Sequence, residues 1–420
     1  MTKRIIAIAF IFVSASIAWA VLGGTIFART YDSGATSSSR VASTWGSEQN
    51  QGPPTASFKT QVSSQQETIE NGKKTTKTIQ TEYTTALPLE SSTIEVRLNL
   101  DHRQKGLLWY STYKVDFSGI YTFRNTSDKD QLVDFKLQFP TAQAIYDNLT
   151  FVVDGVPVSL SNEKNAAMSS AKVGAGKTAQ LAIGYGSQGL NEWRYSFGSG
   201  EVSQVRGFSL HMTTNFKDID FPDNTLSPSV KNETNTGYDL KWSYTSLLSG
   251  YQIAMVMPEK LQPGPLAGRI SFFAPVSLFF FFFLMLIITT MRGIDLHPMN
   301  YFFLAAAFFS FHLLLAYLVD HISIHASFAI AAAVSIFLVV SYLRLVVGIR
   351  FASREAALAQ FIYLVMFSYA FFLKGFTGLA ITIGSISTLF VVMQVTGRVK
   401  WAEKFAVQEA EPAGELNLNT

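Results

Sequence analysis

Five long apolar runs in the last third of the chain constrain its fold more than any other feature. A helix needs about 20 apolar residues to cross the hydrocarbon core of a bilayer, and each run is of that order. The runs follow one another at residues 270–291, 299–319, 326–347, 356–373 and 376–396. We therefore predict a membrane block of five packed helices over residues 269–401.

Positively charged residues indicate how this block is oriented. Short basic loops stay in the cytoplasm, whereas loops on the other side carry few Lys and Arg residues. Basic segments with Arg292, with Arg344, Arg350 and Arg354, and with Arg398, Lys400 and Lys404 alternate with segments that hold little beyond Asp320 or Lys374. We expect the block to enter the membrane from the outer side at Ile270 and to end in the cytoplasm after Thr396. Residues 402–420 would then form a cytoplasmic tail.

Another apolar run, residues 5–27, follows Lys3 and Arg4 at the N-terminus. A signal peptide has the same basic start, and Ala18-Trp19-Ala20 offers a small-x-small cleavage site. However, the run is longer than the roughly 7 to 15 apolar residues of a signal peptide. We interpret residues 1–28 as an uncleaved anchor that crosses outward. Both termini would then lie in the cytoplasm, with about six spans and one large outer domain.

The predicted outer part begins with a segment that has little apolar surface to bury. Residues 29–54 are rich in Ser, Thr, Gly, Gln and Asn, a composition that cannot order itself. We predict a tether here, with local order near Trp45-Gly46. Residues 55–268 then alternate short apolar and polar segments with turn residues, a pattern typical of a β-rich domain.

Within this domain, Asn71-Gly72 is the strongest hairpin signal, because both residues tolerate the positive φ angles of a tight turn. It lies between predicted strands at residues 57–69 and 73–83. A bend or bulge is expected at Ser118-Gly119 in the apolar segment 108–123. Further strands are predicted at residues 93–100, 131–138, 149–153, 178–185, 194–197, 208–214 and 238–244. Many short strands at this spacing favour a sandwich or a large twisted antiparallel sheet.

Composition agrees with a molecule divided between membrane and water. An apolar fraction of 48% with a positive mean hydropathy is too high for an ordinary soluble chain. The chain has no Cys, which excludes disulfides and Cys-ligated metal sites. The net charge of +3 says little about partners, because much of it comes from the basic clusters beside the spans. We expect the lipid bilayer as a partner and no nucleic acid.

Several stretches resemble the CreD family of bacterial inner membrane proteins, a family linked to cell envelope integrity and colicin tolerance. The matching stretches are residues 41–53 (VASTWGSEQNQGP), 94–123 with GLLWYSTYKVDFSGIYTF, 296–301, 317–322 (YLVDHI) and 396–401. The resemblance implies a bacterial inner membrane protein connected with envelope stress, and it implies no reaction. Together with the topology, it predicts a membrane α+β protein: an N-terminal transmembrane anchor, a large β-rich periplasmic domain and a C-terminal five-helix block.

One glycine-rich stretch looks like the end of a phosphate-binding loop. Val173-Gly174-Ala175-Gly176-Lys177-Thr178 has the final Gly-Lys-Thr of that motif. The motif also needs Gly five positions before its last Gly, where this chain has Ala171, and neither a clear strand before the loop nor a helix after it is predicted. We therefore interpret the stretch as a hairpin turn.

Asp320, His321 and His325 are weak candidates for a metal site, with His312 about two turns inside the same predicted helix. Imidazole and carboxylate groups bind metals, and an intramembrane His is costly enough to suggest a function. In the alternative interpretation, Asp320 and His321 form a polar helix end while His312 hydrogen-bonds to a neighbouring helix. We favour that alternative and expect no metal and no cofactor. His297, before Pro298, is expected to cap a helix.

The predicted spans contain no Asp, Glu, Lys or Arg away from their ends; Arg269, Arg292, Arg344, Glu355 and Lys374 all lie at span ends. Proton- or ion-coupled transporters usually need ionisable groups at mid-membrane depth, so their absence argues against such a transporter. Small residues in the last span are interpreted as close-packing positions; they include Thr382, Gly384, Ser385 and Ser387. No nucleophile elbow or metalloprotease motif is present, so we expect no enzyme and no catalytic residue.

The sequence therefore predicts an integral membrane protein of envelope integrity or stress response. Its outer domain would bind a protein, a peptide or an envelope component, for example by pairing at an exposed strand edge. Two alternatives remain. A transporter of lipids or small solutes would have a continuous polar cavity through its helices, and a membrane-embedded enzyme would gather ionisable groups at the periplasmic face.

Overall fold

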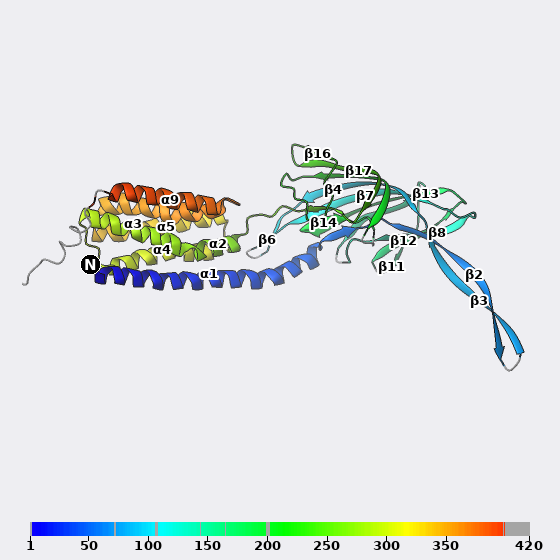
Figure 1. The fold of residues 1–420 in the computed structure, drawn as a ribbon, viewed down its shortest axis with the longest axis horizontal. Coiled ribbons are helices and arrows are strands. Elements are labelled where there is room, and N and C mark those ends of the chain that lie inside the picture. Colours follow the sequence, from blue (N-terminus) through cyan, green and yellow to red (C-terminus); the bar gives the residue numbers. More distant parts are fainter. Residues whose placement is uncertain are drawn as a thin grey trace, which may run out of the picture. The chain divides into compact units, whose positions relative to one another are not determined.

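The computed structural model describes residues 2–70, 73–105, 108–142, 144–163, 165–198, 202–397 and 399 (Figure 1). The chain forms two compact units. A helical unit comprises Met1–Ala35, Gly106–Leu108 and Leu261–Thr420, and a strand unit comprises Thr36–Lys105 and Trp109–Lys260. The predicted membrane α+β class is confirmed: an N-terminal apolar helix, a β-rich domain and five C-terminal apolar helices are present.

The first helix, α1, runs from Thr2 to Trp45. We expected a tether over residues 29–54, and this prediction is wrong: the helix continues to Trp45, and Gln49–Gln51 form a strand in which both glutamines are buried. Extending an existing helix requires no new nucleation step. Residues with weak helix propensity can therefore continue a long apolar helix. Val41 and Trp45, one turn apart, also make contacts in the strand unit: Val41 is buried, and the Arg103 guanidinium carbon lies 3.4 Å from the centre of the Trp45 ring.

The helical unit consists of apolar helices. They are α2 (Pro263–Phe272), α3 (Ala274–Arg292), α4 (Pro298–Leu318), α5 (Ile324–Val346), a composite helix from Ile349 to Phe372, and α9 (Thr377–Thr396). Of these, α2, α3 and α4 have proline in their first turn and α5 has a Ser323 side-chain cap. Among the described residues, six helices are long and apolar enough to span a membrane, as predicted. The predicted cap at His297 is confirmed, because its Nδ1 accepts from the Met299 amide at 3.2 Å.

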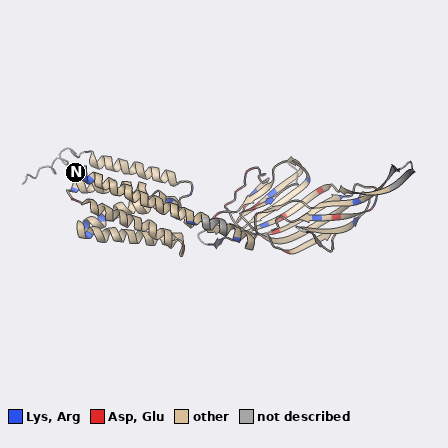
Figure 2. Ribbon diagram, turned by 90° about the horizontal axis from the view of Figure 1, so that it is seen from below, with Lys and Arg blue, Asp and Glu red and all other residues tan. Residues whose placement is uncertain are grey.

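The predicted run 270–291 differs from one continuous helix. It is divided at Phe273, which ends α2 and precedes α3. Pro275 explains the break, because proline has no amide hydrogen and its ring clashes with the carbonyl four residues earlier. Charged residues of the helical unit lie toward helix ends, and the middle of the bundle is free of them among the residues drawn in colour (Figure 2).

The strand unit is built mainly from two sheets. The larger has the order β10-β9-β13-β7-β4-β15-β17-β16, and the smaller has the order β11-β12-β8-β2-β3. Two minor sheets are β1-β14-β18 and β5-β6. The strands are β1 (Gln49–Gln51), β2 (Thr55–Glu70), β3 (Lys73–Ala86), β4 (Leu89–Leu100), β5 (Arg103–Lys105), β6 (Leu108–Tyr110), β7 (Thr112–Arg124), β8 (Gln131–Gln138), β9 (Tyr146–Val153), β10 (Val156–Pro157), β11 (Ser161–Glu163), β12 (Ala166–Val173), β13 (Thr178–Leu190), β14 (Glu192–Tyr195), β15 (Ser203–Thr214), β16 (Val230–Glu233), β17 (Tyr238–Ser249) and β18 (Ile253–Val256).

The two large sheets share one core, as a sandwich requires. Phe123 of β7 and Phe135 of β8 come from different sheets, and their rings meet edge to face at 5.9 Å. Both side chains are buried. The alternation predicted for residues 93–100 is realised in β4, where Ile94, Val96 and Leu98 point into this core. The sheet is not purely antiparallel, because β4 and β15 pair in parallel.

The expected bend at Ser118-Gly119 is wrong. Gly119 stays in register, opposite Ile94 of β4 and Ile183 of β13. Glycine occurs here because the Tyr121 ring lies across the position: a Cβ atom on Gly119 would sit 2.7 Å from that ring. The glycine therefore makes room for a buried tyrosine two residues along the same face.

The hairpin predicted around Asn71-Gly72 is confirmed by its strands. β2 and β3 pair antiparallel from Ser57 opposite Ala86 to Glu70 opposite Lys73. Asn71 and Gly72 themselves lie outside the described residues. Only Thr55–Phe58 of β2 also pairs with β8, so from Lys59 onward the two strands form a ribbon on their own (Figure 1). We call the segment Lys59–Glu70 with Lys73–Thr84 the ribbon.

Candidate functional site

The composite helix between α5 and α9 is irregular. It consists of α6 (Ile349–Phe351), a π-helix η1 (Ala352–Ala356), α7 (Ala357–Gln360), a second π-helix η2 (Phe361–Met366), α8 (Phe367–Tyr369) and a 3-10 turn η3 (Ala370–Phe372). A π-turn shifts the backbone hydrogen bonds by one residue, and such turns often mark functional sites. The Ser277 hydroxyl of α3 donates to the Tyr363 carbonyl within η2. This hydrogen bond connects the π-helix η2 to the neighbouring helix α3.

The last helix, α9, packs against few other residues. Along the 18 most apolar consecutive residues of α9, 6% are buried, compared with 44% along the corresponding stretch of the composite helix. Val392 is the one buried residue along its described length. In a bilayer, the rest of its surface would therefore face hydrocarbon or whatever binds beside it.

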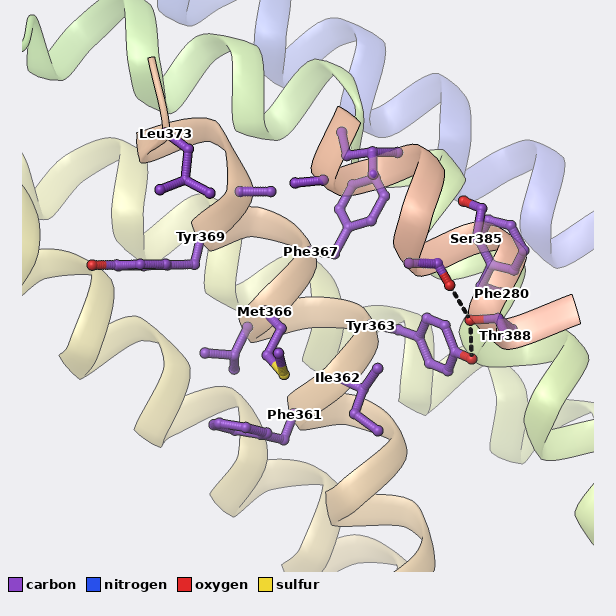
Figure 3. A pocket seen from close by; sticks show the side chains of 15 residues that line it. Phe280, Phe361, Ile362, Tyr363, Met366, Phe367, Tyr369, Leu373, Ser385 and Thr388 are labelled. Atoms are coloured by element: carbon purple, nitrogen blue, oxygen red, sulfur yellow. Dashed lines mark hydrogen bonds between the residues drawn. The ribbon is translucent and has the colours of Figure 1, made fainter. Parts of the chain in front are cut away.

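A pocket of about 430 Å³ lies between the composite helix and α9 (Figure 3). Its volume falls within the range of roughly 300–1,000 Å³ that small-molecule sites occupy. One wall is η2 and the residues after it, the other is one face of α9, and Phe280 of α3 contributes an aromatic ring. The lining residues are Phe280, Phe361, Ile362, Tyr363, Val365, Met366, Phe367, Tyr369, Ala370, Leu373, Ala380, Ile381, Gly384, Ser385 and Thr388.

Small residues of α9 keep this space open. A Cβ atom placed on Gly384 would meet no atom within 4 Å. We predicted close packing at Gly384 and Ser385, and for Gly384 this is wrong. Close packing needs a neighbouring backbone to approach, whereas here no atom lies within 4 Å of the Cβ position at Gly384, and Tyr363 of η2 reaches α9 through its hydroxyl at Thr388 (Figure 3).

Two hydroxyl groups of the pocket form a short hydrogen-bonded chain. The Tyr363 hydroxyl donates to Thr388 Oγ1 at 2.9 Å, and the Thr388 hydroxyl donates to the Gly384 carbonyl at 2.8 Å (Figure 3). None of the described residues that line the pocket carries a charge. The pocket is therefore suited to binding apolar groups, and it offers no acid, base or metal ligand set for chemistry.

The four weak metal candidates do not form one site. Asp320 pairs with Arg29 of α1 at 3.2 Å, His325 lies beside the Phe372 ring at 5.2 Å, and His321 is exposed. Across the part of the chain that the structure describes, no three His, Cys, Asp or Glu residues are grouped in a way that could hold a metal ion.

His312 lies at a different place from the other candidates and is buried. We expected it to hydrogen-bond to a neighbouring helix, and this is wrong: neither ring nitrogen has a hydrogen-bond partner among the described residues. Instead its ring meets the Trp19 ring of α1 edge to face at 5.6 Å and the Phe311 ring at 4.9 Å. Aromatic packing thus takes the place of the expected hydrogen bond.

The phosphate-loop resemblance is excluded by the loop's own contacts. The Ala175 amide, which a phosphate would need, donates to Asp130 Oδ1 at 3.1 Å. The hydrogen bond from Lys172 holds the pKa of the Asp130 carboxyl below its usual value. A negatively charged carboxylate therefore already occupies the position beside the Ala175 amide where a phosphate would bind. The loop is a tight turn, as expected, but it is not a hairpin, because β12 and β13 belong to different sheets.

Sequence reasoning missed how the segment after Trp45 enters the core. Gln49 and Gln51 of β1 are buried, and Gln51 accepts from the Tyr185 hydroxyl at 2.5 Å. Gln49 donates to Ser187 Oγ at 2.8 Å. Burial raises the pKa of Tyr185 well above its usual value, so the hydroxyl stays a donor. Residues 41–53 stood out only through their resemblance to the family, because their polar composition does not indicate a buried strand.

Solved structures give only distant likenesses. A candidate nutrient-binding protein from Legionella pneumophila is 11% identical over 46% of this chain and 72% of that one, with a TM-score of 0.29. An M1 zinc metallopeptidase from Deinococcus radiodurans is 12% identical over 40% of this chain and 42% of that one, with a TM-score of 0.25. This chain thus spans less than half of the peptidase, and both scores are too low to support an argument. A search of curated proteins found no match.

The comparison with family models is decisive. The model of the inner membrane protein CreD matches residues 1–277 and 266–402, which together span both the strand unit and the helices. The six apolar helices agree with the membrane location that this description gives. The chain belongs to the family of the inner membrane protein CreD.

Proposed function

We propose that this inner membrane protein maintains the cell envelope by binding a protein or envelope component through its strand unit on the periplasmic side. The ribbon is the observation that carries the proposal. From Lys59 to Glu70, β2 pairs with β3 and with no other strand of the described residues. Both outer edges of the ribbon are therefore available for pairing with another chain.

The exposure of the ribbon supports a partner. Every side chain described at residues 59–65 and 78–84 is exposed, on both faces of the ribbon. These include apolar residues: Tyr83 is 56% and Val62 is 47% exposed. A two-stranded ribbon without a covered face is marginally stable in water. A third strand supplied by a partner would satisfy an edge and cover a face, and the ribbon would gain stability from it.

The orientation rests on ion pairs within the helical unit. Arg4 pairs with Asp295 after α3 at 2.8 Å, and Arg292 pairs with Glu355 in η1. The helix ends that carry these arginines therefore share one side of the bundle. Because basic helix ends stay in the cytoplasm, we assign this side to the cytoplasm. The chain enters and leaves the strand unit from the opposite helix ends, which supports the proposed periplasmic location of that unit.

Photo-crosslinking in living cells tests the binding proposal. A photoreactive residue at Tyr83 probes the ribbon, and one at Asn232 of β16 probes the exposed edge strand of the other sheet as a matched control. The expected result is a defined protein or envelope adduct from Tyr83 and none from Asn232. Equal adducts from both positions, or none from Tyr83, would contradict the proposal.

A shortened ribbon separates binding from folding. Val62 pairs with Thr81, so replacing residues 63–80 by Asn-Gly keeps the register and closes a two-residue turn. The change leaves Phe58 and the sandwich core intact. We expect unchanged thermal unfolding of the full chain, loss of the Tyr83 adduct, and failure to restore envelope resistance to detergent in cells lacking the protein. Full restoration by the shortened chain would refute the role of the ribbon.

The orientation can be measured independently because the chain has no Cys. Asn232→Cys in the strand unit should react with a membrane-impermeant maleimide in whole cells. Arg350→Cys, at the start of the composite helix, should react only after the cells are opened. The reverse pattern would overturn the periplasmic assignment.

A further inference from the structure

We propose that the pocket between the composite helix and α9 binds one hydrocarbon chain of a membrane phospholipid. The inference does not depend on the proposed function of the strand unit. The pocket lies within the helical unit, and both of its main walls come from helices that are candidate spans. Its surroundings in the cell are therefore acyl chains rather than water.

The chemistry of the lining selects an apolar occupant. Two of its hydroxyl groups already donate hydrogen bonds, Tyr363 to Thr388 Oγ1 and Thr388 to the Gly384 carbonyl. A water molecule in the pocket would need two to four polar partners, which these groups no longer provide. A charged or strongly polar ligand would lose its hydration without compensation. A hydrocarbon chain has neither requirement.

The shape of α9 gives the second argument. Gly384 is at mid-helix, where glycine is a poor helix former compared with alanine. No neighbouring atom of the chain explains a glycine, since a Cβ atom there would meet nothing within 4 Å. On the other wall, the pocket-lining residues Phe361 and Met366 of η2 are 45% and 58% exposed. An occupant that passes over Gly384 accounts for both observations.

Photolabelling of the purified full chain in phosphatidylethanolamine vesicles tests the proposal. The probe is a phosphatidylethanolamine with a diazirine near the end of one acyl chain, and mass spectrometry maps the adducts. In the wild-type chain we expect adducts concentrated on residues 361–373 and 380–388. Labels spread evenly over outward positions such as Phe337 and Leu345, which are 69% and 78% exposed, would overturn the proposal.

Two matched variants sharpen the test. Gly384→Phe fills the pocket, and Gly378→Phe places the same side chain on the same helix outside the pocket; neither added Cβ meets an atom within 4 Å. We expect pocket labelling to fall about tenfold in the first variant, the change that 1.4 kcal/mol of lost binding gives, and to persist in the second. Equal labelling in both would refute the pocket as the site.

Two further outcomes identify a different occupant. If crosslinked dimers replace lipid adducts in the wild-type chain, a second copy fills the pocket and the proposal fails. If a free fatty acid carrying the same diazirine labels the pocket and the phospholipid does not, the phospholipid assignment fails. Should Gly384→Phe unfold, Gly384→Val and the wild-type adduct map still decide the question, because the map needs no substitution.

Discussion

Arg29 of α1 and Asp320 after α4 form an ion pair with a nitrogen-to-oxygen distance of 3.2 Å. The same guanidinium donates to the Ala316 carbonyl at 2.8 Å and lies over the Tyr317 ring at 5.4 Å. At the other end of the first span, Arg4 pairs with Asp295 at 2.8 Å. The N-terminal helix is thus held to the helical unit by an arginine–aspartate pair at each end of its apolar run.

The two pairs should differ in strength. The side chains of Arg29 and Asp320 are 35% and 27% exposed, whereas those of Arg4 and Asp295 are 13% and 79% exposed, so the carboxylate of Asp320 is better shielded from water than that of Asp295. We expect Asp320→Asn to lower the unfolding free energy of the full chain by about 1–2 kcal/mol, between the values for exposed and buried pairs. Asp295→Asn should cost about 0.5 kcal/mol or less. Thermal unfolding in detergent micelles measures both, and equal losses would contradict the argument.

Asn125 organises the loop that resembles a phosphate site. It is fully buried, and its side-chain amide lies 3.0 Å from the Lys129 carbonyl, 3.1 Å from that of Val173 and 3.0 Å from that of Gly174. Asn125→Ala would leave these carbonyls without their donor, so we expect a loss of about 2–3 kcal/mol in unfolding free energy. Asn125→Asp, which keeps the size but removes the donor, should lose as much.

The matched control for this loop is Asn232→Ala. Asn232 is exposed on the edge strand β16, so its replacement should change stability by no more than about 0.5 kcal/mol. Chemical denaturation of the full chain, followed by tryptophan fluorescence, compares the variants. A tolerant Asn125→Asp variant would mean that the side chain acts through its size and not through hydrogen bonding.

The membrane architecture could be predicted from the sequence because the bilayer imposes strict rules on length and charge. The runs that end at Met291, Val319 and Thr396 correspond to α3, α4 and α9 within a few residues. Strand prediction worked where one face is buried, as in β4 with Ile94, Val96 and Leu98. Local pattern suffices there, because alternation directly reports the buried face.

Features that depend on distant partners could not be predicted. The helix beyond residue 29 is made of weak helix formers, and its end depends on the contact between Trp45 and Arg103. The pocket depends on a gap between Gly384 and η2, and no local pattern distinguishes a glycine that permits close packing from one that keeps a space. The burial of Gln51 depends on Tyr185, far away in the sequence. Each is a tertiary contact that outweighs local propensity.

Gly46 should be indispensable where the chain leaves α1 for β1. Its φ angle is +131°, and an added Cβ would lie 2.1 Å from the Gln188 carbonyl oxygen. We expect Gly46→Ala to cost about 3 kcal/mol or more, because both the backbone conformation and the contact are unfavourable. Gly155 is the control: its φ angle is +80° but a Cβ there meets nothing within 4 Å, so Gly155→Ala should cost about 1 kcal/mol. Equal losses would show that the close contact relaxes freely.

The buried tyrosines should make the strand unit sensitive to alkali. Burial raises the pKa of Tyr146 from 10.0 to about 12 and that of Tyr185 well above 10.0. Below pH 10 both the folded and the unfolded chain keep these protons, so stability is constant. Above it the unfolded chain loses protons that the folded chain retains, so the unfolding free energy falls as pH rises from 10 to about 12. For a fully buried tyrosine the slope is about 1.4 kcal/mol per pH unit.

Tyr185→Phe should therefore reduce the pH dependence by that amount, whereas Tyr251→Phe, at a 54% exposed position, should leave it unchanged. Denaturant unfolding of the full chain across this pH range, with tyrosinate absorbance as a second signal, measures both slopes, and an unaltered slope in Tyr185→Phe would show that this hydroxyl titrates equally in both states.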